Sequence, residues 1–251
     1  MNIIRVTKEN LENEHICCAI SNNKDPQVIA KKSWLQKRFE EGCQFVKSDQ
    51  RGKCFIQYGP CENAWAPIDG EGYMYIDCFW VSGQLKGHGY SNDLLDVCIE
   101  DAKKAGMKGL VTLSSKTKKP FLSDPKYLAY KGFKLADKAK PFYELLYLPF
   151  EDNVEPPHFK EHAKQPHVDE TGYVLYYSAA CPYTAKYVPV IEEIAKENNI
   201  PFISHELKSM QEAQQAPAPF TIYSLFYNGE LITHEILSDK KFIKMISEKK
   251  V

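Results

Sequence analysis

The feature that most constrains the fold is a strand, a glycine-containing loop and a helix in direct succession. Residues 73–81 form an apolar, aromatic-rich run that predicts a strand, and residues 90–105 carry apolar residues at helical spacing. Gln84-x-x-Gly87-x-Gly89 lies between them. Glycines let a backbone approach an anion closely, and the first turn of a helix offers unpaired N–H groups. This order predicts a phosphate-binding loop, with an ordinary strand-to-helix turn as the simpler alternative.

The spacing of this loop differs from that of two common phosphate-binding loops. A P-loop requires Gly-x-x-x-x-Gly-Lys-Ser/Thr, and a dinucleotide-binding loop requires Gly-x-Gly-x-x-Gly. Neither pattern is present between residues 82 and 91. Gln84-x-x-Gly87-x-Gly89 after a strand instead resembles the pyrophosphate loop of the GNAT family of N-acetyltransferases, whose pattern is Arg/Gln-x-x-Gly-x-Gly/Ala. The resemblance implies acetyl-coenzyme A (acetyl-CoA) as the ligand.

The order of the other predicted elements supports this resemblance. Before residue 150 the order is β-α-α-β-β-β-α-β-α-β-β, which is similar to that of the GNAT fold. The resemblance implies an α/β (α+β) domain over residues 1–150, with a mixed central sheet flanked by helices. The expected strands are 3–6, 43–47, 53–58, 73–81, 109–114, 132–135 and 142–148, and the expected helices are 7–20, 26–41, 90–105 and 121–131, the last restarting at Asp124-Pro125.

The rest of the chain predicts a linker and a second, smaller domain. Residues 151–170 are rich in proline and polar residues and lack periodicity, which is typical of a linker. Residues 171–251 predict the order β-α-β-α-β-β-α, with Cys181-Pro182-Tyr183-Thr184 at the start of the first helix. This pattern resembles thioredoxin and glutaredoxin, and Pro219 resembles the cis-proline of that fold. The pairing of the two domains resembles the YoaP-type acetyltransferases.

Composition and charge exclude several classes of protein. A hydrophobic content of 43% and a charged content of 26% are typical of a globular protein, and no membrane-spanning run or signal peptide is visible. The net charge of −1 does not indicate a nucleic-acid partner. The eight cysteines contain no Cys-x-x-Cys pair, so we expect a protein of the reducing cytoplasm.

No metal site is expected from the histidines. His158 and His162 are four residues apart, as metal ligands on a helix can be, but they lie among prolines without a third clear ligand. A solvated linker is the favoured interpretation of this segment.

The GNAT resemblance implies a set of cofactor-binding residues. The backbone N–H groups that begin the helix would bind the pyrophosphate, and Gln84 would add a side-chain donor. Lys86 or the lysines at 116, 118 and 119 would meet the ribose phosphate, although a solvated loop is favoured for Lys118 and Lys119. In this family the strand before the loop splays from its neighbour, and its unpaired backbone groups receive the pantetheine arm. The expected cofactor-binding residues are Phe79, Trp80, Val81, Gln84, Leu85, Lys86, Gly87, His88, Gly89 and Tyr90.

The implied chemistry is direct transfer of an acetyl group to an amine of a small molecule or peptide. A general base must take a proton from the amine, and Glu71 or Asp77 is the candidate, with a solvent-facing carboxylate as the alternative for each. Tyr127 or Tyr130 is the candidate acid for the leaving thiolate, with core packing as the alternative. The family's tyrosine lies four residues before the glycine of Gly132-Phe133, and that position is Leu128 in this chain.

Cys181 leaves a second class of function open. It lies at the N-terminal end of a predicted helix, where a thiolate is stabilised. Thr184 replaces the resolving cysteine, so a two-thiol cycle within the motif is impossible. The module is then a monothiol glutaredoxin-like unit or a binding unit without redox function. The alternative function is a redox or thiol-sensing protein whose GNAT domain only binds coenzyme A. Cys78, by contrast, is best explained by burial in its strand.

Overall fold

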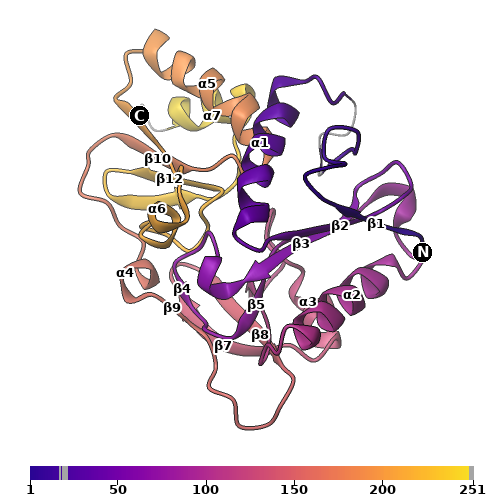
Figure 1. The fold of residues 1–251 in the computed structure, drawn as a ribbon. Helices are drawn as coiled ribbons and strands as arrows, with labels where there is room; N and C mark the ends of the chain where they lie inside the picture. Colours follow the sequence, from indigo (N-terminus) through magenta and orange to yellow (C-terminus); the bar gives the residue numbers. More distant parts are fainter. Residues whose placement is uncertain (17, 19–21, 249–251) are drawn as a thin grey trace.

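The computed structural model describes residues 1–16, 18 and 22–248. Two principal sheets organise these residues, a seven-stranded sheet in the first part of the chain and a four-stranded sheet in the last (Figure 1). Among the described helices, none combines the length and apolar character needed to span a membrane.

The larger sheet is mixed, as expected. Its strand order is β1-β2-β3-β5-β6-β8-β7, in which β5 and β6 are parallel and all other neighbours are antiparallel. The strands are β1 (Ile3–Val6), β2 (Gln44–Ser48), β3 (Cys54–Pro60), β5 (Tyr73–Val81), β6 (Gly109–Ser115), β7 (Lys134–Ala139) and β8 (Tyr143–Pro149).

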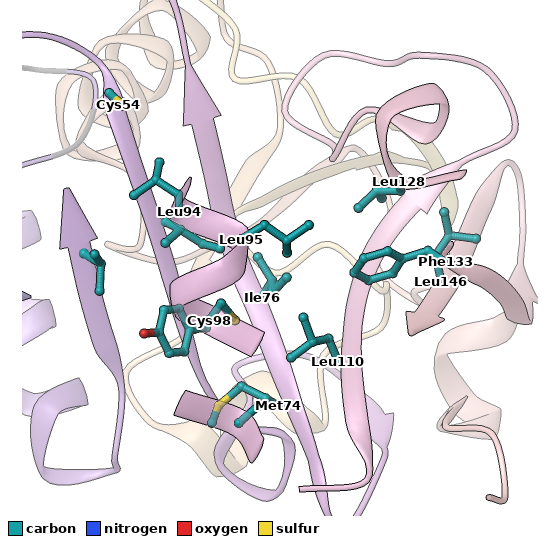
Figure 2. Close-up of a cluster of buried hydrophobic side chains, with 14 residues drawn as sticks. Cys54, Met74, Ile76, Leu94, Leu95, Cys98, Leu110, Leu128, Phe133 and Leu146 are labelled. Carbon is teal, nitrogen blue, oxygen red and sulfur yellow. The ribbon is translucent and has the colours of Figure 1, made fainter. Parts of the chain in front are cut away.

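Helices cover both faces of this sheet. On one face, α1 (Pro26–Glu40) buries Trp34 and Leu35 against β2 and β3. On the other face, α2 (Tyr90–Lys104) and α3 (Pro125–Tyr130) bury their apolar residues against β5 and β6. Figure 2 shows this second core, in which Leu94, Leu95 and Cys98 of α2 lie against the central strands.

The smaller sheet has the order β11-β10-β12-β13. Strands β10 and β11 are parallel, and β12 is antiparallel to both β10 and β13. Helices α5 and α7 bury Val188, Ile191 and Phe242 on one face of the sheet. The elements are β10 (Tyr173–Tyr177), α5 (Pro182–Glu197), β11 (Phe202–Glu206), α6 (Met210–Gln214), β12 (Tyr223–Tyr227), β13 (Glu230–Thr233) and α7 (Asp239–Glu248).

The segment predicted as a linker is docked against the larger sheet. Strand β9 (His158–Phe159) pairs with β4 (Ile68–Asp69), and a short helix, α4 (Glu161–Lys164), follows. Phe159 is fully buried, and its N–H donates to Asp137 Oδ2 at 2.9 Å. This part of the chain therefore has a fixed path.

The two sheets share a core. Leu207, Ala213 and Ala216 of the C-terminal part lie in the same apolar cluster as Trp34 and Leu35 of α1. Helices α1 and α5 lie side by side (Figure 1). The Thr221 hydroxyl donates to the backbone carbonyl of Trp65. These contacts fix the C-terminal part against the face of the larger sheet that α1 covers.

Two expectations were wrong. Residues 8–13 form turns, and residues 7–16 do not form the helix expected over 7–20; residues 17, 19 and 20 of that range lie outside the described residues. The Asn10 side chain accepts from the Thr7 N–H and donates to the Arg5 carbonyl, which competes with helical hydrogen bonding.

The second wrong expectation concerns Pro219. In the described part of the chain the only cis peptide bond is Lys140–Pro141, so the bond before Pro219 is trans. The trans form is the default for a peptide bond before proline.

Candidate active site

Strand β5 leaves its parallel neighbour halfway along its length. Residues from Tyr73 to Ile76 pair with β6, whereas the pairing with β3 continues to Val81. Asp77 is a bulge, because Ile76 and Cys78 face consecutive residues of β3 and Asp77 faces none. The second half of β5 therefore has backbone groups on one edge that no strand satisfies, which is the splay that the GNAT resemblance implies.

The glycine loop begins where the splay ends. A 3₁₀ turn over Gly83–Leu85 is followed by Gly87 at φ 82° and by Gly89, the N-cap of α2, at φ 79°. Both angles are in the left-handed region, which favours glycine. Within the described chain, the backbone N–H groups of residues 87–90 donate to no backbone or side-chain acceptor. Four adjacent donors at a helix N-terminus suit an anion.

A first cavity, of about 460 Å³, extends between the splayed strand, the glycine loop and the segment before α3. Lys118 and Lys119 lie on its wall. The Lys118 Nζ lies 2.8 Å from Asp124 Oδ2. The Lys119 Nζ lies 4.5 Å from the centre of the Phe142 ring. Its lining residues are Phe79, Trp80, Val81, Lys86, Gly87, Ser91, residues 118–124, Tyr127 and Leu128.

Other expected cofactor residues lie near this cavity without lining it. Gln84 and His88 are exposed, and the His88 ring lies 5.6 Å from that of Tyr90. Leu85 packs against the apolar core under α2. The loop therefore offers its backbone to the cavity more than its side chains.

A second cavity, of about 310 Å³, lies between the two sheets. Strands β3 and β5 and helix α1 form one side, and residues 180–183 and 219–222 of the C-terminal part form the other. It shares Phe79, Trp80 and residues 120–123 with the first cavity. The two cavities therefore meet at the splayed half of β5. Sequence reasoning missed this cavity, because no periodic pattern relates α1 to residues 180–183.

Asp77 lies on the wall of the second cavity. Its Oδ2 accepts from Gln57 Nε2 at 3.3 Å and lies 3.8 Å from an Arg38 Nη2 atom. Burial raises the pKa of Asp77 above its ordinary value, and the Arg38 charge opposes this rise. A carboxylate with a raised pKa beside a cavity suits a general base.

Glu71 lies in a different environment. It is exposed in the turn before β5, six residues from Asp77, which is roughly 20 Å along an extended strand. It lines neither of the two cavities described above.

The two tyrosines also differ. Tyr127 lines the first cavity, with its ring 5.7 Å from that of Phe79 and its hydroxyl donating to Asn92 Oδ1 at 3.3 Å. Burial raises the pKa of Tyr127, so its phenol stays protonated and able to donate. Tyr130 is 81% exposed and lines neither cavity. Leu128, at the position of the family's tyrosine, is buried in the core.

Cys181 lies at the N-cap of α5 and on the wall of the second cavity. The Thr184 hydroxyl, at the position of a resolving thiol, donates to the carbonyl oxygens of Ser178 at 2.8 Å and Cys181 at 2.7 Å. Cys78, on strand β5, is half-buried and lines the opposite side of the same cavity. Among the residues that the structure describes, no three metal-ligating side chains cluster in a way that could hold a metal ion.

Comparison with known proteins identifies a close relative. The chain is 40% identical over 245 residues to the "Uncharacterized N-acetyltransferase YoaP" of Bacillus subtilis (strain 168). The match covers 97% of this chain and 98% of that protein. The model of the YoaP-like family matches residues 201–244.

Similar solved structures belong to acetyltransferases. A GNAT-family acetyltransferase of Staphylococcus aureus Mu50 is 16% identical, with a TM-score of 0.41, over 60% of this chain and 99% of that one. The GNAT-family N-acetyltransferase YhbS of Escherichia coli, in complex with CoA, is 14% identical, with a TM-score of 0.40. The match covers 64% of this chain and 90% of YhbS.

Proposed function

This chain belongs to the YoaP-like family, and we propose that it is an acetyl-CoA-dependent N-acetyltransferase that acts on an amine. The observation that carries the proposal is the end of the β5–β6 pairing after Ile76, directly beside a glycine loop with four available N–H groups. A cofactor with a pyrophosphate and an amide-containing arm needs both features, an anion site and unpaired backbone groups.

Each part of the first cavity then has a role in binding. The N–H groups of residues 87–90 bind the pyrophosphate, and Lys86 and Lys118 offer positive charge to the other phosphate. The unpaired edge of β5 near Phe79 and Val81 pairs with the amides of the pantetheine arm. The thioester then lies where the two cavities meet.

Acetyl-CoA supplies an activated acetyl group as its thioester. Asp77, directly or through water, takes the proton that the amine must lose before its lone pair forms the new C–N bond. Tyr127 gives a proton to the sulfur as the C–S bond breaks. Backbone N–H groups of the splayed strand polarise the acetyl carbonyl. The products are the N-acetylated acceptor and the free thiol of coenzyme A.

We also propose that the chain is divided into two domains joined by a linker. Residues 1–150 are the GNAT acetyltransferase domain, and residues 171–251 are a thioredoxin-like domain. Residues 151–170 are the linker between the two domains. The parallel β10–β11 pair, the antiparallel β12 and β13, and Cys181 at the start of α5 support the thioredoxin-like assignment. The eight cysteines, which contain no Cys-x-x-Cys pair, support a reducing, cytoplasmic location.

Titration calorimetry of the reduced protein with acetyl-CoA tests the proposal. We expect saturable binding, weaker for dephospho-coenzyme A, which lacks the ribose phosphate. Release of free thiol upon addition of an acceptor amine then measures transfer. Absence of acetyl-CoA binding would contradict the proposal and leave Cys181 as the remaining candidate for chemistry.

A further inference from the structure

The second cavity holds a buried cation that the protein pairs incompletely. Lys31 of α1 is 2% exposed and lines this cavity. Its ammonium donates one hydrogen bond, to Gln57 Oε1 at 2.7 Å, and makes no ion pair within 4.0 Å in the described part of the chain. An ammonium has three donors, and a buried charge without a counter-charge is costly. The cavity wall therefore offers a positive charge to whatever fills the cavity.

A second donor lies beside it. Trp34 follows Lys31 by three residues on α1, and the Lys31 Nζ lies 4.1 Å from the centre of the Trp34 ring. Trp34 is 6% exposed and lines the same cavity, and its indole N–H has no hydrogen-bond partner among the described residues. Buried polar groups are normally satisfied. Two neighbouring unsatisfied donors on one cavity wall indicate a ligand with an acceptor group, above all an anionic one.

The charge balance of the cavity disfavours a simple amine as the acceptor. Three charged side chains line it: Lys31, Lys53 and Asp77. Arg38 pairs with both Glu41 and Asp77, so the three cations Lys31, Lys53 and Arg38 exceed these two carboxylates by one positive charge. An amine arrives at neutral pH as a cation and would be repelled by this excess unless it carries its own negative group.

The spacing of the polar groups matches one class of amine. Lys31 binds the oxygen of the Gln57 amide, and Asp77 binds its nitrogen. One amide group therefore bridges the Lys31 ammonium and the Asp77 carboxylate, so a single small ligand can reach both charges. The amine and the carboxylate of an α-amino acid lie on adjacent carbons and form a pair of groups that is close enough together to do so. Such a ligand places its carboxylate at Lys31 and its amine at Asp77, side by side. The remaining wall is aromatic, with Phe55, Trp65 and Phe220.

We propose that the acceptor is a small amino acid with an apolar or aromatic side chain, whose carboxylate binds Lys31 and Trp34 and whose amine lies at Asp77. The proposal rests on the proposed acetyltransferase function and specifies its substrate class. The volume of about 310 Å³, closed on one side by residues 180–183 and 219–222, fits a small molecule and not a folded protein tail.

Two matched substrate pairs test the proposal. Thiol release from acetyl-CoA is measured with phenylalanine against phenethylamine, and with leucine against 3-methylbutylamine. Within each pair only the carboxylate differs. We expect kcat/KM to be on the order of 10- to 100-fold higher for the amino acids, which is the effect of a charge-assisted hydrogen bond.

The variant Lys31→Met tests whether Lys31 causes the preference for amino acids over amines. Methionine keeps the volume and removes the charge, so we expect KM for the amino acids to rise by a similar factor, whereas KM for the amines should fall because the repelling charge is gone. Lys37→Met, on the exposed side of the same helix, is the matched control and should change neither. Acetyl-CoA affinity, measured by calorimetry, should be the same in wild type and both variants.

The contrary outcomes separate the two proposals. Equal efficiency on amines and amino acids, an equal loss on both in Lys31→Met, or no turnover of either amino acid by a protein that binds acetyl-CoA would each overturn the substrate class alone. A wild-type protein that does not bind acetyl-CoA would overturn the proposed function together with it.

Discussion

The His234 ring donates from Nε2 to the backbone carbonyl of Pro120 at 2.8 Å. His234 directly follows β13 in the C-terminal part, and Pro120 belongs to the segment that lines both cavities. The ring is 3% exposed and lies among the side chains of Phe142, Tyr143 and Phe220. A single neutral imidazole therefore connects the smaller sheet to the segment where the two cavities meet.

This contact makes stability depend on pH. Burial lowers the pKa of His234 below 6.5, with a smaller opposing effect of the Pro120 hydrogen bond. Below pH 6.5 the unfolded chain binds a proton that the folded chain resists, so the free energy of unfolding should fall as the pH decreases from about 6.5. His234→Gln keeps a donor but does not titrate. Urea unfolding at pH 7.5 and 5.5 should show a smaller pH effect in the variant.

The comparison of wild type with His234→Gln isolates the contribution of His234 to the pH dependence of stability. Burial also lowers the pKa of His15, but that residue is present in both and contributes equally. The same pH dependence in wild type and His234→Gln would contradict the interpretation.

Asp77→Asn should abolish the general base without filling the cavity. We expect kcat to fall by about 10²- to 10⁴-fold, the usual effect of one acid–base group. Because the pKa of Asp77 is raised, the wild-type rate should decline as acid protonates the carboxylate, and the variant should lack this limb. Measurement of kcat/KM against pH in both proteins, with acetyl-CoA affinity as the control for folding, tests the assignment. Glu71→Gln should behave as wild type.

Gly89→Asp should weaken acetyl-CoA binding by placing a carboxylate at the anion site. The position has φ 79°, and a Cβ there would meet no atom within 4 Å, so backbone strain is the only structural cost. Gly89→Asn has nearly the same shape and the same strain but no charge. Calorimetry should show a loss on the order of tenfold or more for the aspartate relative to the asparagine. Equal affinities would place the phosphates elsewhere.

Tyr127→Phe should lower kcat by roughly 10- to 100-fold, because the leaving thiolate loses its proton donor. The ring and its contact with Phe79 remain, so acetyl-CoA affinity should be unchanged. Tyr130→Phe is the matched control, since that side chain is 81% exposed. Thiol-release kinetics that leave Tyr127→Phe as active as Tyr130→Phe would assign Tyr127 to packing.

Cys181 offers a test of the redox alternative. Cys181→Ser keeps the size of the side chain, and if the thiol takes no part in the transfer, turnover should stay within about twofold of wild type. Cys181→Phe adds volume to the wall of the second cavity and should raise KM for the acceptor without changing acetyl-CoA affinity. Thiol-release assays measure both. Lost turnover in Cys181→Ser, with acetyl-CoA still bound, would give the thiol a chemical role.

Local chemistry made much of the fold predictable. Strand β5 and the start of α2 lie at the residues expected, because an aromatic strand, glycines and an apolar helical face are all local signals. Asp124-Pro125 likewise starts α3, where the Asp124 carboxylate accepts from the backbone N–H groups of Lys126 and Tyr127. The hydrogen bonds of the Asn10 side chain, which compete with those of a helix, are also local. The helical spacing of apolar residues over 7–20 nevertheless led to the wrong prediction.

The candidate acceptor site was not predictable in this way. Lys31, Gln57 and Asp77 come from α1, β3 and β5, and their contacts depend on how the sheet is ordered. The opposite wall comes from Cys181 and Phe220, which follow by more than 100 residues. Long-range packing of this kind leaves no periodic pattern in a single sequence. The residues of the proposed acceptor site are therefore brought together only by the three-dimensional fold.

The shared wall of the two cavities has a kinetic consequence. Phe79 and Trp80 border both cavities, so an acyl donor in one and an acceptor in the other would meet at the splayed half of β5. A reaction arranged in this way proceeds through a ternary complex. Initial-rate plots at several concentrations of both substrates should then intersect, and coenzyme A should leave only after the acceptor has arrived.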